Sequence, residues 1–206
     1  MFGFMVGQSF HLFQLIPEVA ALAHWPQLVP EIPRHEDPNL LTDFTRLETQ
    51  IMTWDPAASL GENHPSSSEE VTAASHTAGL IHHHALLIFL RASLCGPGIP
   101  PSHFLAQIDE LLCEFMSFLN VLTASNRVWT NLLWAVLIAG SCVRNLDDRE
   151  CIHNTLVAQT HRMNTSTRVL QVLHWVWDAV DVDPVAYGPH GISTVCKKNG
   201  VKISLG

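Results

Sequence analysis

The chain has 206 residues, of which 47% are hydrophobic, so it can bury a core without a disulfide framework or a structural metal. Lys and Arg together number 11 against 19 Asp and Glu, which gives a formal net charge of −8. Binding to a nucleic-acid backbone depends on clustered cations, so this charge argues against direct contact with DNA or RNA.

The cysteines and the N-terminus indicate where the protein works. The five cysteines stand at irregular spacings without a C-x-x-C pair, which is typical of reduced thiols rather than of a disulfide framework. No basic segment precedes the apolar N-terminal stretch, and the most apolar run, residues 128–143, is short for a membrane span. We therefore expect an intracellular protein, in the nucleus or the cytoplasm, without membrane contact.

The first third of the chain alternates helical and irregular patterns. Apolar residues recur at helical spacing over residues 10–23, with a kink or a new helix start expected near Pro17. Four prolines within residues 25–38 predict an extended loop, and an apolar stripe predicts a helix over residues 39–54. Residues 55–68, rich in Ser, Pro and polar side chains, are predicted to be a flexible linker.

The rest of the chain is predominantly helical in pattern. A hydroxyl and two acidic residues at 68–70 predict the start of a long helix that ends before Gly96 and is apolar nearly all round in its second half, which is typical of an enclosed helix. Further helices are predicted over residues 102–123, 128–143, 147–161 and 165–180. The tail, residues 181–206, is rich in Gly and Pro and is predicted to be irregular. The sequence therefore predicts an all-α protein, one domain over residues 1–206, built as a bundle of six to seven helices.

Histidine is unusually frequent, with 13 in the chain, and His82, His83 and His84 are consecutive. Consecutive side chains on a helix point about 100° apart, so these three cannot converge on one metal ion. The wider pair His153 and His161 also lacks the i, i+4 spacing of a helical metal site. We expect no metal and no cofactor. If the chain is an enzyme, His83 or His84 is the candidate general acid or base, because imidazole titrates near neutral pH.

Other catalytic patterns are missing from the sequence. It contains no G-x-S-x-G elbow, no P-loop, no G-x-G-x-x-G and no H-E-x-x-H. The adjacent carboxylates Asp147 and Asp148 stand at a predicted helix start, where the helix dipole favours negative charge. We interpret them as helix-start residues rather than as a paired-carboxylate site.

Several stretches resemble, in order, the fungal-specific effector domain that follows the DNA-binding module of fungal binuclear zinc-cluster transcription factors. They are residues 6–23, 40–54, 78–94, 132–152 and 173–177. The most specific is 132–152, where Trp134, an Ala-Gly step ending at Gly140 and then Arg149 follow one another, and Trp177 closes the last stretch. We interpret these four residues as packing residues, because aromatic and small residues at helical spacing usually belong to a core.

Two of these residues have predicted contacts. Gly140 should let another backbone approach its helix closely. Arg149 should pair with a carboxylate beside it in the chain, Asp147, Asp148 or Glu150, or cap the carbonyls of a neighbouring helix.

The resemblance implies a transcription-regulator effector domain, but the six-cysteine zinc cluster and basic stretch of the family are absent from these 206 residues. We expect the chain to act through contacts with proteins or a small molecule, in regulating a fungal secondary-metabolite gene cluster. One alternative is a small-molecule isomerase or cyclase of fungal secondary metabolism that reuses this helical scaffold with histidine acid–base chemistry. Another is a helical adaptor that binds a full-length regulator or a second copy of itself.

Overall fold

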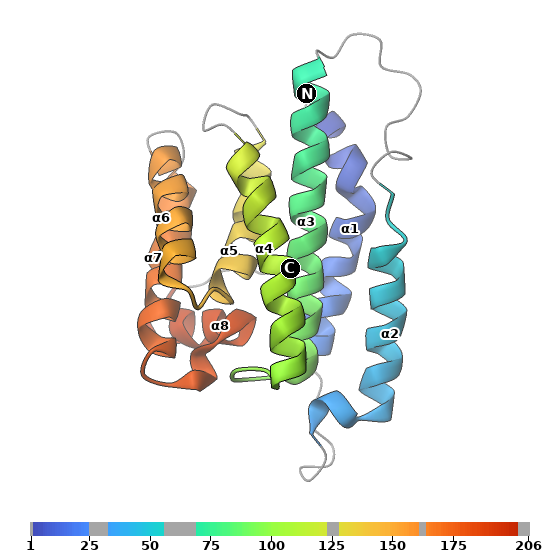
Figure 1. Ribbon diagram of the computed structural model, residues 1–206, viewed down its shortest axis with the longest axis vertical. Coiled ribbons are helices and arrows are strands. Elements are labelled where there is room, and N and C mark those ends of the chain that lie inside the picture. The colour runs from blue at the N-terminus through green and yellow to red at the C-terminus, as the bar shows by residue number, and fades with distance from the viewer. Residues whose placement is uncertain (1, 25–32, 56–68, 123–127, 161–163, 202–206) are drawn as a thin grey trace.

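The computed structural model describes residues 2–24, 33–55, 69–122, 128–160 and 164–201. Over these residues it contains eight α-helices, two short 3-10 helices and no strand, so the all-α prediction is confirmed (Figure 1). The elements are α1 (Phe2–Ala23), η1 (Arg34–Glu36), α2 (Pro38–Met52), α3 (Glu69–Cys95), α4 (Ser102–Val121), α5 (Trp129–Ser141), α6 (Leu146–Thr160), α7 (Asn164–Val180), η2 (Pro184–Ala186) and α8 (Gly188–Lys198).

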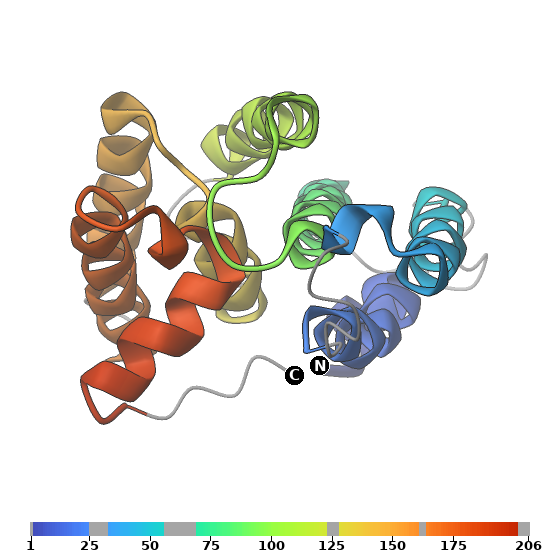
Figure 2. The same ribbon diagram turned by 90° about the horizontal axis from the view of Figure 1, so that it is seen from below.

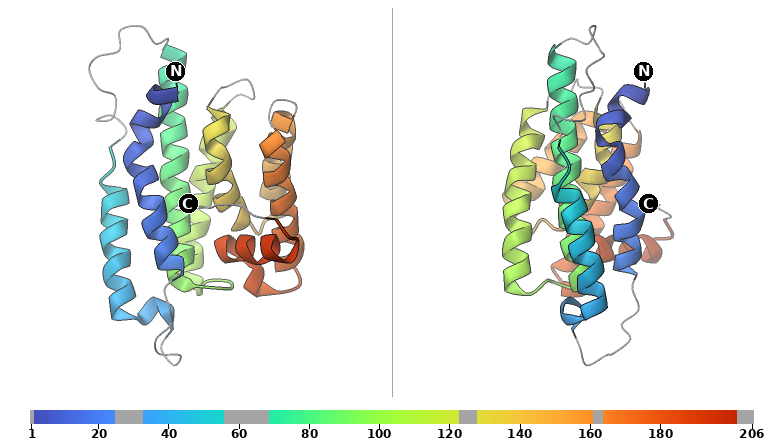
Figure 3. Two further views of the ribbon diagram at one scale, coloured as in Figure 1. Left: turned by 180° about the vertical axis from the view of Figure 1, so that it is seen from behind. Right: turned by 90° about the vertical axis from the view of Figure 1, so that its right-hand side faces the viewer.

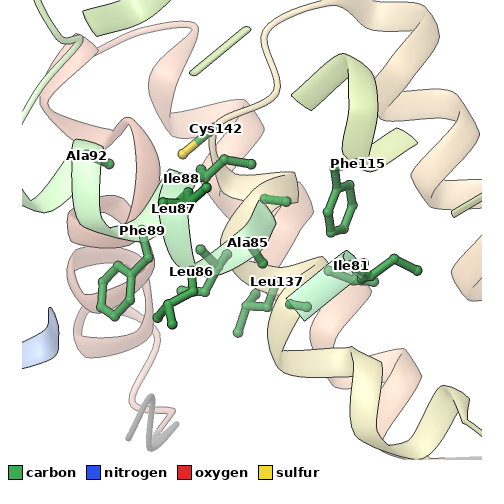
Figure 4. Packing of buried hydrophobic residues seen from close by; sticks show 14 of the residues in the cluster. Ile81, Ala85, Leu86, Leu87, Ile88, Phe89, Ala92, Phe115, Leu137 and Cys142 are labelled. Atoms are coloured by element: carbon green, nitrogen blue, oxygen red, sulfur yellow. The ribbon is translucent and has the colours of Figure 1, made fainter. Parts of the chain in front are cut away.

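Helix α3 is the centre of the bundle. It packs against α1, α2, α4, α5 and α8, and the view from below shows α1 and α2 on one side of it and α5 to α8 on the other (Figure 2). Its second half is apolar nearly all round because neighbours surround it: Ala85, Ile88 and Leu90 are each 0% exposed, and Figure 4 shows Ala85 and Ile88 within the packed core. The stretch Ala73–Cys95 is long and apolar enough to cross a membrane, but 78% of its most apolar window is buried in the bundle. Its composition therefore follows from its central position.

The predicted helix starts and ends are corrected in two places near the N-terminus. Helix α1 runs without interruption from Phe2 to Ala23, so a new helix start near Pro17 is wrong; Pro17 is exposed on its surface. Residues 25–32 of the predicted loop 25–38 lie outside the described residues, and its end is replaced by η1 and by the first residue of α2, Pro38. Asp37 caps α2, because its Oδ1 accepts a hydrogen bond from the Asn39 amide at 2.9 Å. Apart from Asp55, the predicted linker 55–68 lies outside the described residues.

The tail requires the largest correction, because its residues 184–198 are mostly helical rather than irregular, which also raises the helix count above the expected range. Gly188, at φ +69°, turns the chain, and Pro189 occupies the first turn of α8, where a missing amide hydrogen is harmless. Ile192, Val195 and Cys196 then bury one face of α8, which packs against α5 and α7. Helix α8 lies crosswise to the long helices (Figure 3).

Candidate functional site

His82 binds the central helix to two neighbours. Its ring is buried, with Nδ1 2.8 Å from the Ala78 carbonyl oxygen and Nε2 2.9 Å from the Asn131 carbonyl oxygen of α5. The edge of the ring also meets Phe13 of α1, with centroids 4.7 Å apart. Burial lowers the pKa of His82, although the two carbonyls that it faces favour the protonated ring.

His83 points toward α2 instead. Its half-buried ring stacks on Trp54, just beyond the end of α2, with centroids 5.5 Å apart and planes 25° apart. Burial is the main cause that lowers its pKa to about 4, and the adjacent His84 lowers it further, while the Ile51 carbonyl and the Glu114 carboxylate oppose the shift. At neutral pH His83 is therefore an uncharged aromatic side chain that fills the α2–α3 contact.

His84 points toward α4. Its Nε2 lies 2.6 Å from Glu114 Oε2, and its Nδ1 lies 2.8 Å from the Leu80 carbonyl oxygen. Its ring also packs against Phe118, with centroids 5.2 Å apart. Both ring nitrogens therefore face oxygen acceptors of the protein, one a backbone carbonyl and the other a carboxylate.

The three consecutive histidines thus connect α3 to different helices: His82 to α1 and α5, His83 to α2, and His84 to α4. The prediction that they diverge is confirmed, and its reason is the rotation per residue of a helix. In the described part of the chain, no three His, Cys, Asp or Glu residues group as metal ligands. An open concavity does lie over α2, lined by Leu41, Thr42, Thr45, Arg46 and Thr49. None of these residues is a histidine, so the histidine run and this concavity are separate features.

Arg149 forms a second cluster, at the junction of α5, α6 and α7. The side chain is 9% exposed, and its two terminal nitrogens each donate to a carboxylate oxygen of Asp181 at 3.1 Å. Its Nε donates to the Val143 carbonyl oxygen, 3.2 Å away, just beyond the end of α5. The guanidinium carbon lies 5.8 Å from the centre of the Trp177 ring. The expected pairing with a carboxylate beside it in the chain is wrong, whereas the expected capping of a neighbouring helix is present.

Trp177 extends this cluster to Gly140. Its Nε1 donates a hydrogen bond of 2.9 Å to the Gly140 carbonyl oxygen. A Cβ at Gly140 would lie 3.0 Å from the side chain of Leu173, so the absence of a side chain lets α5 and α7 approach. The structure therefore brings Gly140, Arg149 and Trp177 together. Trp134 lies elsewhere, edge-on to Phe89 of α3, with centroids 6.1 Å apart.

Sequence reasoning missed three interhelical contacts. Arg34 donates to the carbonyls of Leu22, at 2.9 Å, and Ser93, at 3.2 Å, and so joins the C-terminal ends of α1 and α3. His153 hydrogen-bonds to His174 of α7 at 3.0 Å, whereas His161, the residue considered with it from the sequence, lies outside the described residues. The third contact is the ion pair made by Asp181. This residue belongs to the tail that the sequence predicted to be irregular. No local pattern marks any of these pairs, because their members lie 12 to 59 residues apart, the widest being Arg34 and Ser93.

These contacts define a helical scaffold domain, in which the prominent polar and aromatic side chains connect its own helices. The profile of the fungal specific transcription factor domain matches residues 1–206, and the chain belongs to this family. No curated protein and no solved structure matches the chain. Membership of this family supports a regulator-like, intracellular role.

Proposed function

We propose that the chain is an effector domain that regulates transcription in the nucleus through contacts with other proteins or with a small molecule, and not by reading DNA. Family membership over residues 1–206 is the observation that carries this proposal. We expect its targets to include genes of a fungal secondary-metabolite cluster.

The arginines support the part of the proposal that concerns DNA. Four of them pair with carboxylates at 2.7 to 3.1 Å: Arg46 with Glu18, Arg91 with Glu48, Arg144 with Asp109 and Arg149 with Asp181. Positive charge that is neutralised within the protein contributes little to counterion release from a phosphate backbone. Together with the net charge of −8, this pairing disfavours a nucleic-acid interface.

A tethering experiment tests the regulatory role. The chain is fused to an unrelated DNA-binding module in a fungal host, and a reporter downstream of the matching operator is measured. We expect expression to change several-fold relative to the DNA-binding module alone. An unchanged reporter, with the fusion present in the nucleus at equal abundance, would overturn the proposal. So would a tight, salt-sensitive complex between the purified chain and DNA.

The enzyme alternative has one supporting contact, the pairing of His84 with Glu114, because a carboxylate often orients a catalytic imidazole. Against it, both ring nitrogens of His84 face acceptors of the protein itself, and His83 is stacked on Trp54. Replacing His83 and His84 by Gln in a producing strain separates the two readings. We expect the strain that carries the folded double variant to convert every biosynthetic intermediate as before. Loss of one conversion step without loss of folding would favour the enzyme.

A further inference from the structure

Two histidines form a hydrogen-bonded pair across the contact between α6 and α7. His153 of α6 and His174 of α7 bring their rings together, with His153 Nδ1 3.0 Å from His174 Nε2. The two helices pack side by side (Figure 1, Figure 2). Both residues are half-buried, so their rings are held against the protein and still meet solvent. A small ligand can therefore reach the pair from outside.

The two rings meet edge to edge rather than face to face. Their planes differ by only 9°, and their centroids are 5.1 Å apart, whereas the facing nitrogens are 3.0 Å apart. The facing nitrogens, His153 Nδ1 and His174 Nε2, therefore project toward each other from rings that lie nearly in one plane. In such a hydrogen bond one inner nitrogen carries the shared proton and the other offers its lone pair. The pair thus presents two imidazole nitrogens at one point.

The separation of these nitrogens is close to the one that a metal ion requires. Zn²⁺ binds imidazole nitrogen at about 2.0 to 2.1 Å, usually with tetrahedral geometry. Two nitrogens bound in that way are about 3.3 to 3.4 Å apart, compared with 3.0 Å between His153 and His174. An increase of about 0.3 to 0.4 Å, with each ring turned so that its lone pair faces the same point, satisfies this geometry.

The outer nitrogens leave the rings free to make this adjustment. Within the described part of the chain, His153 Nε2 and His174 Nδ1 make no hydrogen bond, so no second partner fixes either ring. When an ion binds, the shared proton moves to the outer nitrogen of its own ring, and both inner nitrogens give their lone pairs to the ion. Both rings stay neutral, and no proton is lost. The His174 ring keeps its contact with Trp177, whose centroid is 5.5 Å away.

The charges around the pair favour a cation. Glu150 stands three positions before the histidine of α6, and Asp178 stands four positions after the histidine of α7. These spacings place each carboxylate on the same helix face as the ring. Both are exposed, and their negative potential attracts a cation although they complete no three-ligand group among the described residues. The neighbouring cation, Arg149, is already paired with Asp181.

We propose that His153 and His174 form a two-histidine site that binds a divalent transition ion such as Zn²⁺ or Ni²⁺ between α6 and α7, with water completing its coordination. Imidazole is a ligand that these ions prefer, whereas Mg²⁺ selects oxygen ligands. The bound ion takes the place of the shared proton and ties the two helices together. The sequence-based expectation of no metal considered spacings along one helix, and so compared His153 with His161. The site goes beyond the proposed regulatory role and does not depend on it.

Thermal melts of the full chain, followed by circular dichroism, test the site. The chain is treated with a chelator and dialysed, and melts are then recorded with Ni²⁺, Zn²⁺ or Mg²⁺. An ion that binds only the folded chain should raise the melting temperature by about 3 to 6 °C at about ten times its Kd. We expect this rise with Ni²⁺ and Zn²⁺ and none with Mg²⁺. Equilibrium dialysis should show one bound Ni²⁺ per chain that the variant lacking both histidines does not bind.

Single variants show whether the two rings act together. Because both nitrogens hold one ion, His153→Gln and His174→Gln should each remove most of the rise, and the double variant should lose no more. Glutamine retains a donor and an acceptor for the remaining ring, and an unchanged far-UV spectrum confirms folding. The matched control, His11→Gln/His103→Gln, removes two exposed histidines from α1 and α4 and should keep the full rise.

Four results would overturn the proposal. The first is the absence of any rise with Ni²⁺ and Zn²⁺ together with no bound Ni²⁺ in dialysis. The second is a full rise in the variant that lacks both His153 and His174. In the third, the control variant loses as much as this double variant, which would assign the binding to scattered surface histidines. In the fourth, the losses of the two single variants add up, which would mean two independent contacts instead of one shared ion.

Discussion

Acidification should weaken the bundle through His83. The ring is half-buried against Trp54, and its pKa is lowered from 6.5 to about 4, chiefly by burial. A histidine whose pKa is lower in the folded than in the unfolded state stabilises the fold above the unfolded pKa. This stability is lost as the pH falls from the unfolded pKa toward the folded one. The expected window is therefore from about pH 6.5 down to about pH 4.

The size of this effect follows from the linkage relation. With these two pKa values, the free energy of unfolding should fall by about 2 kcal/mol between pH 7 and pH 5. Because part of the ring meets solvent, which screens the charge, about 1 to 2 kcal/mol is the expected loss. The groups facing the ring act in opposite directions, since His84 lowers the pKa while Glu114 and the Ile51 carbonyl raise it.

The assay is urea unfolding followed by circular dichroism at several pH values, for the original chain and for His83→Phe. Phenylalanine keeps an aromatic ring against Trp54 but does not titrate. We expect the original chain to lose about 1 to 2 kcal/mol more than His83→Phe between pH 7 and pH 5. As a control, His11→Phe, at an exposed position of α1, should leave the pH dependence unchanged. Parallel curves for the original chain and His83→Phe would show that the burial of this ring does not govern acid stability.

Three further substitutions or reactions probe the second half of the chain. Gly191→Ala should lower the stability by about 3 kcal/mol or more, because a Cβ there overlaps the carbonyl of the short helix before α8; thermal melts measure this. Asp181→Asn should cost about 1 to 2 kcal/mol by leaving the buried Arg149 poorly paired, and a double-mutant cycle with Arg149→Met should show coupling. Iodoacetamide should modify exposed Cys113 well before Cys142 in the native protein, because burial raises the pKa of the Cys142 thiol to about 12; mass spectrometry follows both.

Controls for these tests lie on the same elements. Ser193→Ala, at an exposed position of α8, should leave the melting temperature nearly unchanged, and equal melts for it and Gly191→Ala would contradict the overlap with Ala186. Additive free energies in the cycle would contradict direct coupling between Arg149 and Asp181. Alkylation of Cys142 as fast as that of Cys113 would contradict its burial, and complete reaction in urea is the control for accessibility.

Local patterns accounted for most of the helices. The apolar run within α3 predicted an enclosed helix because a helix that is hydrophobic all round is stable only among neighbours. The stripe of α2 and the helix start predicted near residue 69 are local signals of the same kind. The prediction of an irregular tail was wrong because Gly188 and Pro189 usually interrupt helices. Here each of them favours the start of α8, where its conformation is needed. Local composition there concealed the short amphipathic face of α8.

Local sequence patterns thus predicted the helical class, the apolar core and the divergence of His82, His83 and His84, because each depends on the geometry of one helix. The neighbour that each ring meets, and the partner of Arg149, depended on how the helices pack. Asp181 lies 32 residues beyond Arg149, and only the arrangement of α6 and α7 brings their charges within 3.1 Å. Contacts between distant segments are set by the packing of whole helices, which no short stretch of sequence specifies.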